Sequence, residues 1–184
     1  MFNSLFENFE RFQTFLVGLL GFAGVIYTIR MNGRLVRQQY ERERNQERAA
    51  LRTALIAELG ALRNTYEDRI HMLRKDDSGH SFLIPEYVSN HVYYQLLDRI
   101  GLLTAEELEL VIDTYLLVTE LPIRLKLLAK GTSDSSEQAG YIHIGKEFAA
   151  DAAQIHDNFL SKIITALATI QRKLEQLDNE LINP

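Results

Sequence analysis

The five histidines and the scattered carboxylates are the residues of this chain best suited to chemistry. The histidines are His71, His80, His91, His143 and His156. A di-iron helical bundle needs inward-facing carboxylates and two Glu-x-x-His units. The nearest approximations are Asp68-x-x-His71 and His143-x-x-x-Glu147, and neither matches that pattern. We therefore expect the histidines to be surface residues or hydrogen-bonded groups at the edge of a core.

Other catalytic signatures are absent from the sequence. The chain has no cysteine, which excludes thiol catalysis, haem thiolate ligation and cysteine zinc sites. It contains no complete G-x-x-x-x-G-K-[ST], G-x-G-x-x-G, H-E-x-x-H or G-x-S-x-G motif. Asp113 and Glu120 fall inside a predicted helix, but a carboxylate without a base or an acceptor is not a mechanism. The sequence therefore predicts no enzyme, no cofactor and no metal site.

Tyr87, Tyr93 and Tyr94 crowd one short segment and are the candidate partner surface. Aromatic rings with polar tips are typical of interfaces. The same rings are also suited to sealing a helical bundle, and we favour that packing role over the partner surface.

The element that organises the chain is the apolar run Phe12–Ile29, which has no charged residue. Its 18 residues would extend roughly 27 Å as a helix, close to the ~30 Å hydrocarbon core of a bilayer. The alternatives are a cleaved signal peptide and a buried core helix. The preceding segment carries Glu7, Glu10 and Arg11 rather than a basic start, and the run has no polar face. We predict a single uncleaved membrane span, preceded by an amphipathic segment within residues 1–29.

The charge around this run predicts its orientation. Arg30, Arg34 and Arg37 follow the run closely, whereas only Arg11 precedes it. Lys and Arg favour the cytoplasmic side of a span. We therefore expect a single-pass protein of the bacterial inner membrane, with its N-terminus outside and its C-terminal domain in the cytoplasm. The three arginines are also the expected contacts for anionic lipid head groups.

Gly18, Gly21 and Gly24 lie inside the predicted span. Small residues let two helix backbones approach each other in lipid. The spacing is not the GxxxG pattern, and glycine is common in membrane spans. The sequence therefore leaves self-association through this face open.

The charge of the rest of the chain is divided unevenly. Residues 30–52 hold seven Arg and three Glu, a net charge of +4, whereas residues 53–184 hold 12 Lys or Arg and 20 Asp or Glu, a net charge of −8. An acidic domain repels phosphate, so we expect no nucleic acid among the partners.

The hydrophobic pattern after the span predicts an all-α fold. Residues 30–50 should form a basic, solvated stalk helix, and residues 51–184 an antiparallel bundle of about four helices. The stalk helix should continue to about Arg74, through an apolar stripe formed by Leu51, Leu55, Leu59, Leu62, Tyr66, Ile70 and Leu73.

Three further helices complete the predicted bundle. Pro85 suits the first turn of a second helix that runs to about Ile100, with Gly101 as its stop. Residues 104–107, Thr-Ala-Glu-Glu, form a capping box that opens a third helix. That helix has the apolar stripe Leu108, Val111, Ile112, Tyr115, Val118 and Leu125, with Pro122 as an expected kink. Residues 131–140 should be an exposed loop, residues 141–145 are either extended or helical, and residues 146–181 should form the last helix.

Two functions from different classes fit this architecture. The first is a membrane-anchored scaffold whose bundle docks an unknown cytoplasmic protein or assembles with copies of itself. The alternative is an oligomeric membrane effector of the defence type, in which several spans assemble into a pore or otherwise perturb the bilayer. A helical-bundle enzyme has no set of residues to support it.

Overall fold

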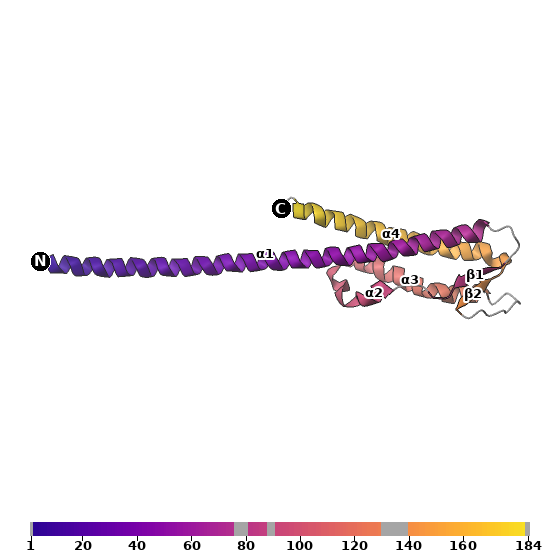
Figure 1. Ribbon diagram of the computed structural model, residues 1–184, viewed down its shortest axis with the longest axis horizontal. Coiled ribbons are helices and arrows are strands. Elements are labelled where there is room, and N and C mark those ends of the chain that lie inside the picture. The colour runs from indigo at the N-terminus through magenta and orange to yellow at the C-terminus, as the bar shows by residue number, and fades with distance from the viewer. Residues whose placement is uncertain (1, 76–80, 88–90, 130–139, 183–184) are drawn as a thin grey trace. The chain divides into compact units, whose positions relative to one another are not determined.

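The computed structural model describes the backbone of residues 2–75, 81–87, 91–129 and 140–182, and the side chains of residues 17–75, 81–87, 91–129 and 140–179. The described chain is mostly helical (Figure 1), as the sequence predicts. It divides into two units, residues 1–46 and residues 47–184.

Helix α1 (Phe2–Lys75) includes the predicted span, the stalk and the first helix of the bundle. Its predicted core stripe is confirmed, since all seven side chains are buried: Leu51, Leu55, Leu59, Leu62, Tyr66, Ile70 and Leu73. These residues recur every three or four positions, which places them on one face of a helix. The predicted end near Arg74 is one residue short of the observed end.

A two-stranded antiparallel sheet is the main departure from the predicted all-α fold. Strand β1 (Phe82–Pro85) pairs with strand β2 (Tyr141–Ile144), with Phe82 opposite Ile144 and Ile84 opposite Ile142. The prediction that Pro85 opens a helix is wrong, because Pro85 is the last residue of β1. Phe82 and Ile84 are buried and Leu83 is exposed, the alternation of a strand with one buried face.

The segment after β1 also differs from the predicted second helix. It forms the short helix α2 (His91–Gln95) and the 3-10 helix η1 (Leu97–Leu102), in place of one helix to Ile100. Residues 76–80 and 130–139, which contain the predicted helix break and most of the predicted exposed loop, lie outside the described residues.

Helix α3 (Ala105–Ala129) begins where the capping box predicts. The Thr104 N–H donates to the Glu107 carboxylate over 2.8 Å, and the Glu107 N–H donates to the Thr104 hydroxyl over 3.4 Å. The helix continues through Pro122. After β2, the 3-10 helix η2 (Lys146–Phe148) leads into helix α4 (Ala149–Ile182). The question left open for residues 141–145 is thus answered, since residues 141–144 form a strand.

In the described part of residues 47–184, the bundle has three long helical segments, from α1, α3 and α4. Helices α1 and α3 run in the same direction (Figure 1). Arg52 of α1 contacts Glu107 of α3, and about two turns further along both helices Glu58 of α1 contacts Tyr115 of α3. Helix α4 is antiparallel to α3. The predicted antiparallel bundle of about four helices is corrected accordingly, because the segment between α1 and α3 returns along the bundle instead of forming a long helix.

Candidate functional site

The carboxylate of Glu58 is a buried anchor for α2. Glu58 lies on α1, and its oxygens accept hydrogen bonds from the backbone N–H groups of Val92 and Tyr93, each over 2.9 Å, and from the Tyr115 hydroxyl. Backbone N–H groups in the first turn of a helix have no partner within that helix. Glu58 therefore caps α2, which at five residues is too short to be stable alone.

The three predicted tyrosines separate into one packed ring and two exposed rings. Tyr93 stacks on Tyr115, with ring centroids 3.9 Å apart and an interplanar angle of 10°. Burial raises the pKa of the Tyr93 hydroxyl, and Tyr94 raises it further. Tyr87 and Tyr94 are 80% and 54% exposed. The packing role therefore applies to Tyr93, and the structure leaves Tyr87 and Tyr94 as the exposed part of the candidate partner surface.

A groove of about 630 Å³ lies beside Tyr87, between α1 and the segment that includes β1 and α2. Its lining is mainly apolar and small: Ala54, Ala57, Ala61, Leu62, Thr65, Pro85, Tyr87 and Val92, with Glu58, Arg69 and His91 as its ionisable members. Glu58 already accepts three hydrogen bonds. A concave, mainly apolar lining with a few polar groups is typical of ligand-binding pockets.

Arg52 and Glu107 form a buried ion pair that connects α1 to α3. The Arg52 Nε and Nη2 atoms lie 2.7 and 3.0 Å from the two Glu107 oxygens, and the side chains are 6% and 0% exposed. Burial alone would raise the pKa of the Glu107 carboxyl, but hydrogen bonds from Arg52 and Thr104 outweigh it and hold the pKa below its ordinary value. Glu107 is thus ionised and serves both as a helix cap and as an anchor.

A second buried polar cluster lies between α1 and α4. The rings of Tyr66 and His156 meet edge to face at 5.4 Å. His156 Nδ1 lies 2.8 Å from the Ala152 carbonyl, and because a carbonyl only accepts, Nδ1 carries the proton. Among the described residues, no hydrogen-bond partner is found for His156 Nε2, the Tyr66 hydroxyl or Arg69 Nη1. Burial lowers the pKa of His156 and raises that of Tyr66, so both side chains are neutral.

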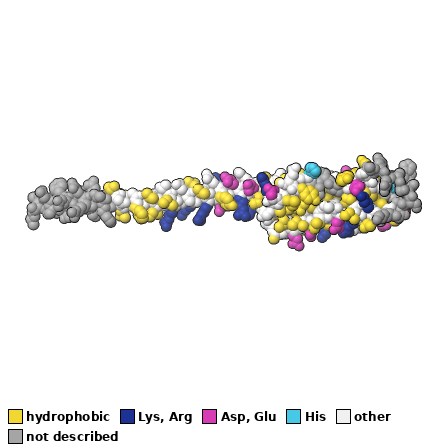
Figure 2. Space-filling model, turned by 90° about the horizontal axis from the view of Figure 1, so that it is seen from below, with side chains coloured by type: hydrophobic (Ala, Val, Ile, Leu, Met, Phe, Trp, Pro, Cys, Tyr) yellow, Lys and Arg dark blue, Asp and Glu magenta, His cyan; other side chains and the backbone are white. Residues whose placement is uncertain are grey.

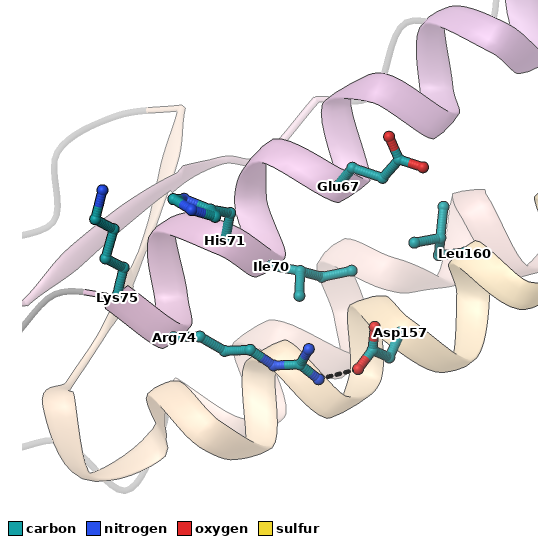
Figure 3. Close-up of a pocket in the computed structure, with 7 residues that line it drawn as sticks. All are labelled: Glu67, Ile70, His71, Arg74, Lys75, Asp157 and Leu160. Carbon is teal, nitrogen blue, oxygen red and sulfur yellow. Dashed lines mark hydrogen bonds and ion pairs between the residues drawn. The ribbon is translucent and has the colours of Figure 1, made fainter.

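A smaller pocket of about 420 Å³ lies near the end of α1 (Figure 3). Residues of α1 and α4 form it: Glu67, Ile70, His71, Arg74, Lys75, Asp157 and Leu160. Arg74 and Asp157 meet across it as an ion pair. Asp157 is therefore already paired with Arg74, and the pocket offers no nucleophile beside a base.

Metal binding finds no support in the described part of the chain. It brings together no group of three or more His, Cys, Asp and Glu side chains that is able to hold an ion. Asp68 and His71 are exposed on α1, and His143 and Glu147 lie on β2 and η2.

The residues predicted to meet the membrane lie on the N-terminal part of α1. A Cβ atom added to Gly18, Gly21 or Gly24 would have no heavy atom within 4 Å. Arg30, Arg34 and Arg37 are exposed.

Among the residues that the structure describes with their side chains, no helix has a stretch long and apolar enough to cross a membrane. Residues 12–16 of the predicted span lie outside the described side chains.

Sequence patterns did not predict the anchoring roles of Arg52 and Glu58. Arg52 resembles the exposed arginines before it, and Glu58 resembles a solvated helix residue. Their partners Glu107 and Tyr115 lie 55 and 57 residues away, beyond the reach of helical periodicity.

Comparison of this chain with models of protein families, with curated proteins and with solved structures finds no match.

Proposed function

We propose that this chain is a membrane-anchored helical interaction module of the bacterial inner membrane. Residues 12–29 anchor it, the N-terminus faces outward, and the bundle lies in the cytoplasm, where it docks a partner protein or assembles with copies of itself. The proposal includes no catalytic role.

The observation that carries the proposal is the exposure of an unbroken apolar stretch of α1. From Val17 to Ile29 every described side chain is exposed, and the large apolar ones are 38–70% exposed: Val17, Leu19, Leu20, Phe22, Val25, Ile26, Tyr27 and Ile29. Burying apolar surface is favourable by roughly 25 cal/mol per Å², and exposed apolar surface of this extent indicates a membrane or a partner. Figure 2 shows hydrophobic side chains on this part of α1, followed along the helix by Lys and Arg side chains.

Two features of the bundle support a docking role for it. Tyr87 and Tyr94 present exposed aromatic rings, and the apolar groove beside Tyr87 is lined mainly by small side chains. Tyrosine is enriched in the energetically important centres of interfaces. A cytoplasmic protein is the partner that we assign to this surface.

The anchor is tested by extracting bacterial membranes with alkaline carbonate, which releases peripheral proteins. We expect the full chain to stay in the membrane pellet. Arginine at the centre of a span costs about 2.5–3.5 kcal/mol, so the variant with Leu20→Arg and Val25→Arg should move to the supernatant. The matched control is Leu35→Arg with Val36→Arg, which lies beyond the predicted span and should stay in the pellet. Release of the wild-type chain by carbonate would overturn the anchor.

The orientation is tested with single cysteines, because the chain has none of its own. A membrane-impermeant maleimide applied to spheroplasts should label a Ser4→Cys chain and leave a Gln154→Cys chain unlabelled until the membrane is permeabilised. Labelling of Gln154→Cys in intact spheroplasts would contradict the proposed topology.

The oligomeric membrane effector is the second candidate function. It is favoured by the open faces of Gly18, Gly21 and Gly24, where an added Cβ meets nothing, since such faces allow close helix contacts in lipid. If the spans form a pore, replacing the three glycines by leucine should abolish release of a dye from vesicles that hold the full chain. A tether should release no dye in either form.

A further inference from the structure

Helix α3 is apolar on two opposite sides. One side faces the bundle core, where Val111, Val118, Leu121 and Leu125 are buried. A second set, here called the outer stripe, is exposed: Ile112 by 38%, Leu116 by 58%, Ile123 by 60% and Leu127 by 63%. Figure 2 views the α3 side of the bundle and shows hydrophobic side chains gathered there. An ordinary surface helix has one apolar face and one polar face.

The outer stripe forms a continuous ridge along α3. At 3.6 residues per turn its members fall within an arc of about 60°, on the side away from the core residues, and they extend over roughly 22 Å. Ile112 with Leu116, and Ile123 with Leu127, are pairs four residues apart, which is the spacing of neighbours on a helix surface. A ridge of this kind can pack into a second helix.

The spacing of the residues in the outer stripe is the same when it is followed in either direction along α3. The intervals between its members are four, seven and four residues. If two copies of α3 pack antiparallel about a two-fold axis between Thr119 and Glu120, Ile112 of one copy lies opposite Leu127 of the other, and Leu116 lies opposite Ile123. Such self-complementarity is what a two-fold interface requires.

The charges beside the outer stripe complement the same arrangement. Asp113 and Arg124 are eleven residues apart, which is close to three turns, so they lie on one flank of α3. In a two-fold antiparallel pair each flank meets the same flank of the partner. The position opposite Asp113 is 126, two residues or about 3 Å along the axis from Arg124. Asp113 is exposed and forms no ion pair with the described residues, and Arg124 is half-exposed and pairs with Glu120 at 2.8 Å. In a parallel pair about a two-fold axis each flank lies beside the opposite flank of the partner, so Asp113 of one copy and Arg124 of the other would lie on different sides of the interface.

We propose that the outer stripe of α3 is a homodimer interface, covered by α3 of a second copy in antiparallel orientation. This inference goes beyond the proposed function, because it names a second copy as the occupant of a surface separate from the groove. It depends on the bundle and not on the membrane span.

Single cysteines in the full chain, held in mild detergent, test both the contact and its direction. Under a mild oxidant, Thr119→Cys lies next to the two-fold axis and should give a disulfide-linked dimer roughly tenfold more readily than the exposed control Gln154→Cys, because facing thiols have a high effective concentration. Ile112→Cys alone should not cross-link, since its copies lie roughly 22 Å apart along the axis. A mixture of Ile112→Cys and Leu127→Cys chains should cross-link.

Two results of this cross-linking experiment would overturn the proposal. If Thr119→Cys cross-links no faster than Gln154→Cys, the outer stripe is not covered by a second copy. If Ile112→Cys alone cross-links as well as the mixture does, the helices are parallel and the proposed pairing is wrong.

A substitution series separates this interface from contacts between spans. Leu116→Lys should weaken the dimer at least about thirtyfold, as expected for a charge at the centre of an interface, when its mass is followed by light scattering over a dilution series. Ile164→Lys, at an exposed apolar residue of α4, is the matched control and should not change the affinity of the dimer. The leucine variants of Gly18, Gly21 and Gly24 should also leave the dimer intact, and loss of the dimer in those variants alone would overturn the assignment to α3.

Discussion

Glu58 shows how one polar residue can position a whole segment of this bundle. Its carboxylate holds the first turn of α2 through two backbone N–H groups and orients Tyr115 beneath Tyr93. Glutamine at this position presents one oxygen and one NH₂ group, so an N–H donor would lose its acceptor. We expect Glu58→Gln to lower the free energy of unfolding by about 2–3 kcal/mol, measured by urea unfolding of the full chain in mild detergent.

The matched control for Glu58 is an exposed carboxylate of the same helix. Glu67 pairs with Arg63 on the surface, with side chains 45% and 44% exposed. Exposed pairs of this kind contribute little, so Glu67→Gln should change stability by less than about 0.5 kcal/mol. Equal losses in the two variants would show that Glu58 does not anchor α2.

The folded chain should lose stability in mild acid because His156 is buried and neutral. Burial lowers the pKa of this imidazole in the folded state below its ordinary value of 6.5, so the unfolded chain takes up the proton first. Stability is therefore fully present above about pH 6.5 and falls as the pH decreases from there toward the lower folded pKa, by about 1.4 kcal/mol for each pH unit crossed. The charged groups around the ring are Arg69 from α1, which opposes protonation, and Asp157 from α4, which favours it. Tyr66 of α1 contacts the ring and is neutral.

The measurement is the urea midpoint of unfolding at about pH 7.5 and about pH 5.5. The wild-type chain should be less stable at the lower pH, and the variant His156→Leu should lose most of that difference. His71 is exposed, so the variant His71→Gln should keep the difference in stability between the two pH values. If His156→Leu retains the full pH dependence, another group is responsible.

At the scale of elements, only one face of strand β1 should contribute strongly to the stability of the folded chain. Ile84 is 1% exposed and lies opposite Ile142, whereas its neighbour Leu83 is 44% exposed. Removing a buried Ile side chain to alanine costs about 2–5 kcal/mol, so Ile84→Ala should strongly lower the urea midpoint. Leu83→Ala changes the other face of the same strand and should change stability by less than about 1 kcal/mol. A similar effect of the two substitutions would contradict an arrangement in which Ile84 is buried and Leu83 is exposed.

Long elements were predictable from the sequence because many residues repeat the same signal. The stripe from Leu51 to Leu73 spans six turns, and the Thr104–Glu107 capping box marks the start of α3. The strands were missed because each has four residues, too few to establish an alternation, and because Pro85 is equally suited to a helix start and to a strand end.

The outer stripe of α3 was missed for a different reason. Ile112 was counted with the core residues, although Val111 is the buried member of that pair and Ile112 is exposed. The leftover residues Leu116, Ile123 and Leu127 are at helical spacing with Ile112, and this pattern was present in the sequence. What the sequence does not contain is the direction in which the core lies, because that depends on where α1 and α4 pack.

At the scale of the whole molecule, the uneven charge predicts how the chain is oriented. Arg30, Arg34 and Arg37 are the first three arginines after the proposed span. Because positive charge close to a span sets its orientation, replacing all three by glutamine should give a mixed population in which part of the Gln154→Cys sites become accessible to the impermeant maleimide. Replacing Lys162, Arg172 and Lys173 by glutamine removes the same charge far along the chain and should leave the orientation unchanged. An unchanged orientation in the first variant would show that these arginines do not set it.

The two apolar sides of α3 also bear on how this sequence is able to diverge over evolution. In α4 one side of the helix contacts solvent, and its polar residues are free to exchange for one another. In α3 the core side and the outer stripe are both constrained, and only the narrow flanks between them are less constrained. Among natural variants of this chain, we therefore expect α3 to accumulate substitutions more slowly than α4, and the exposed position 116 to remain apolar.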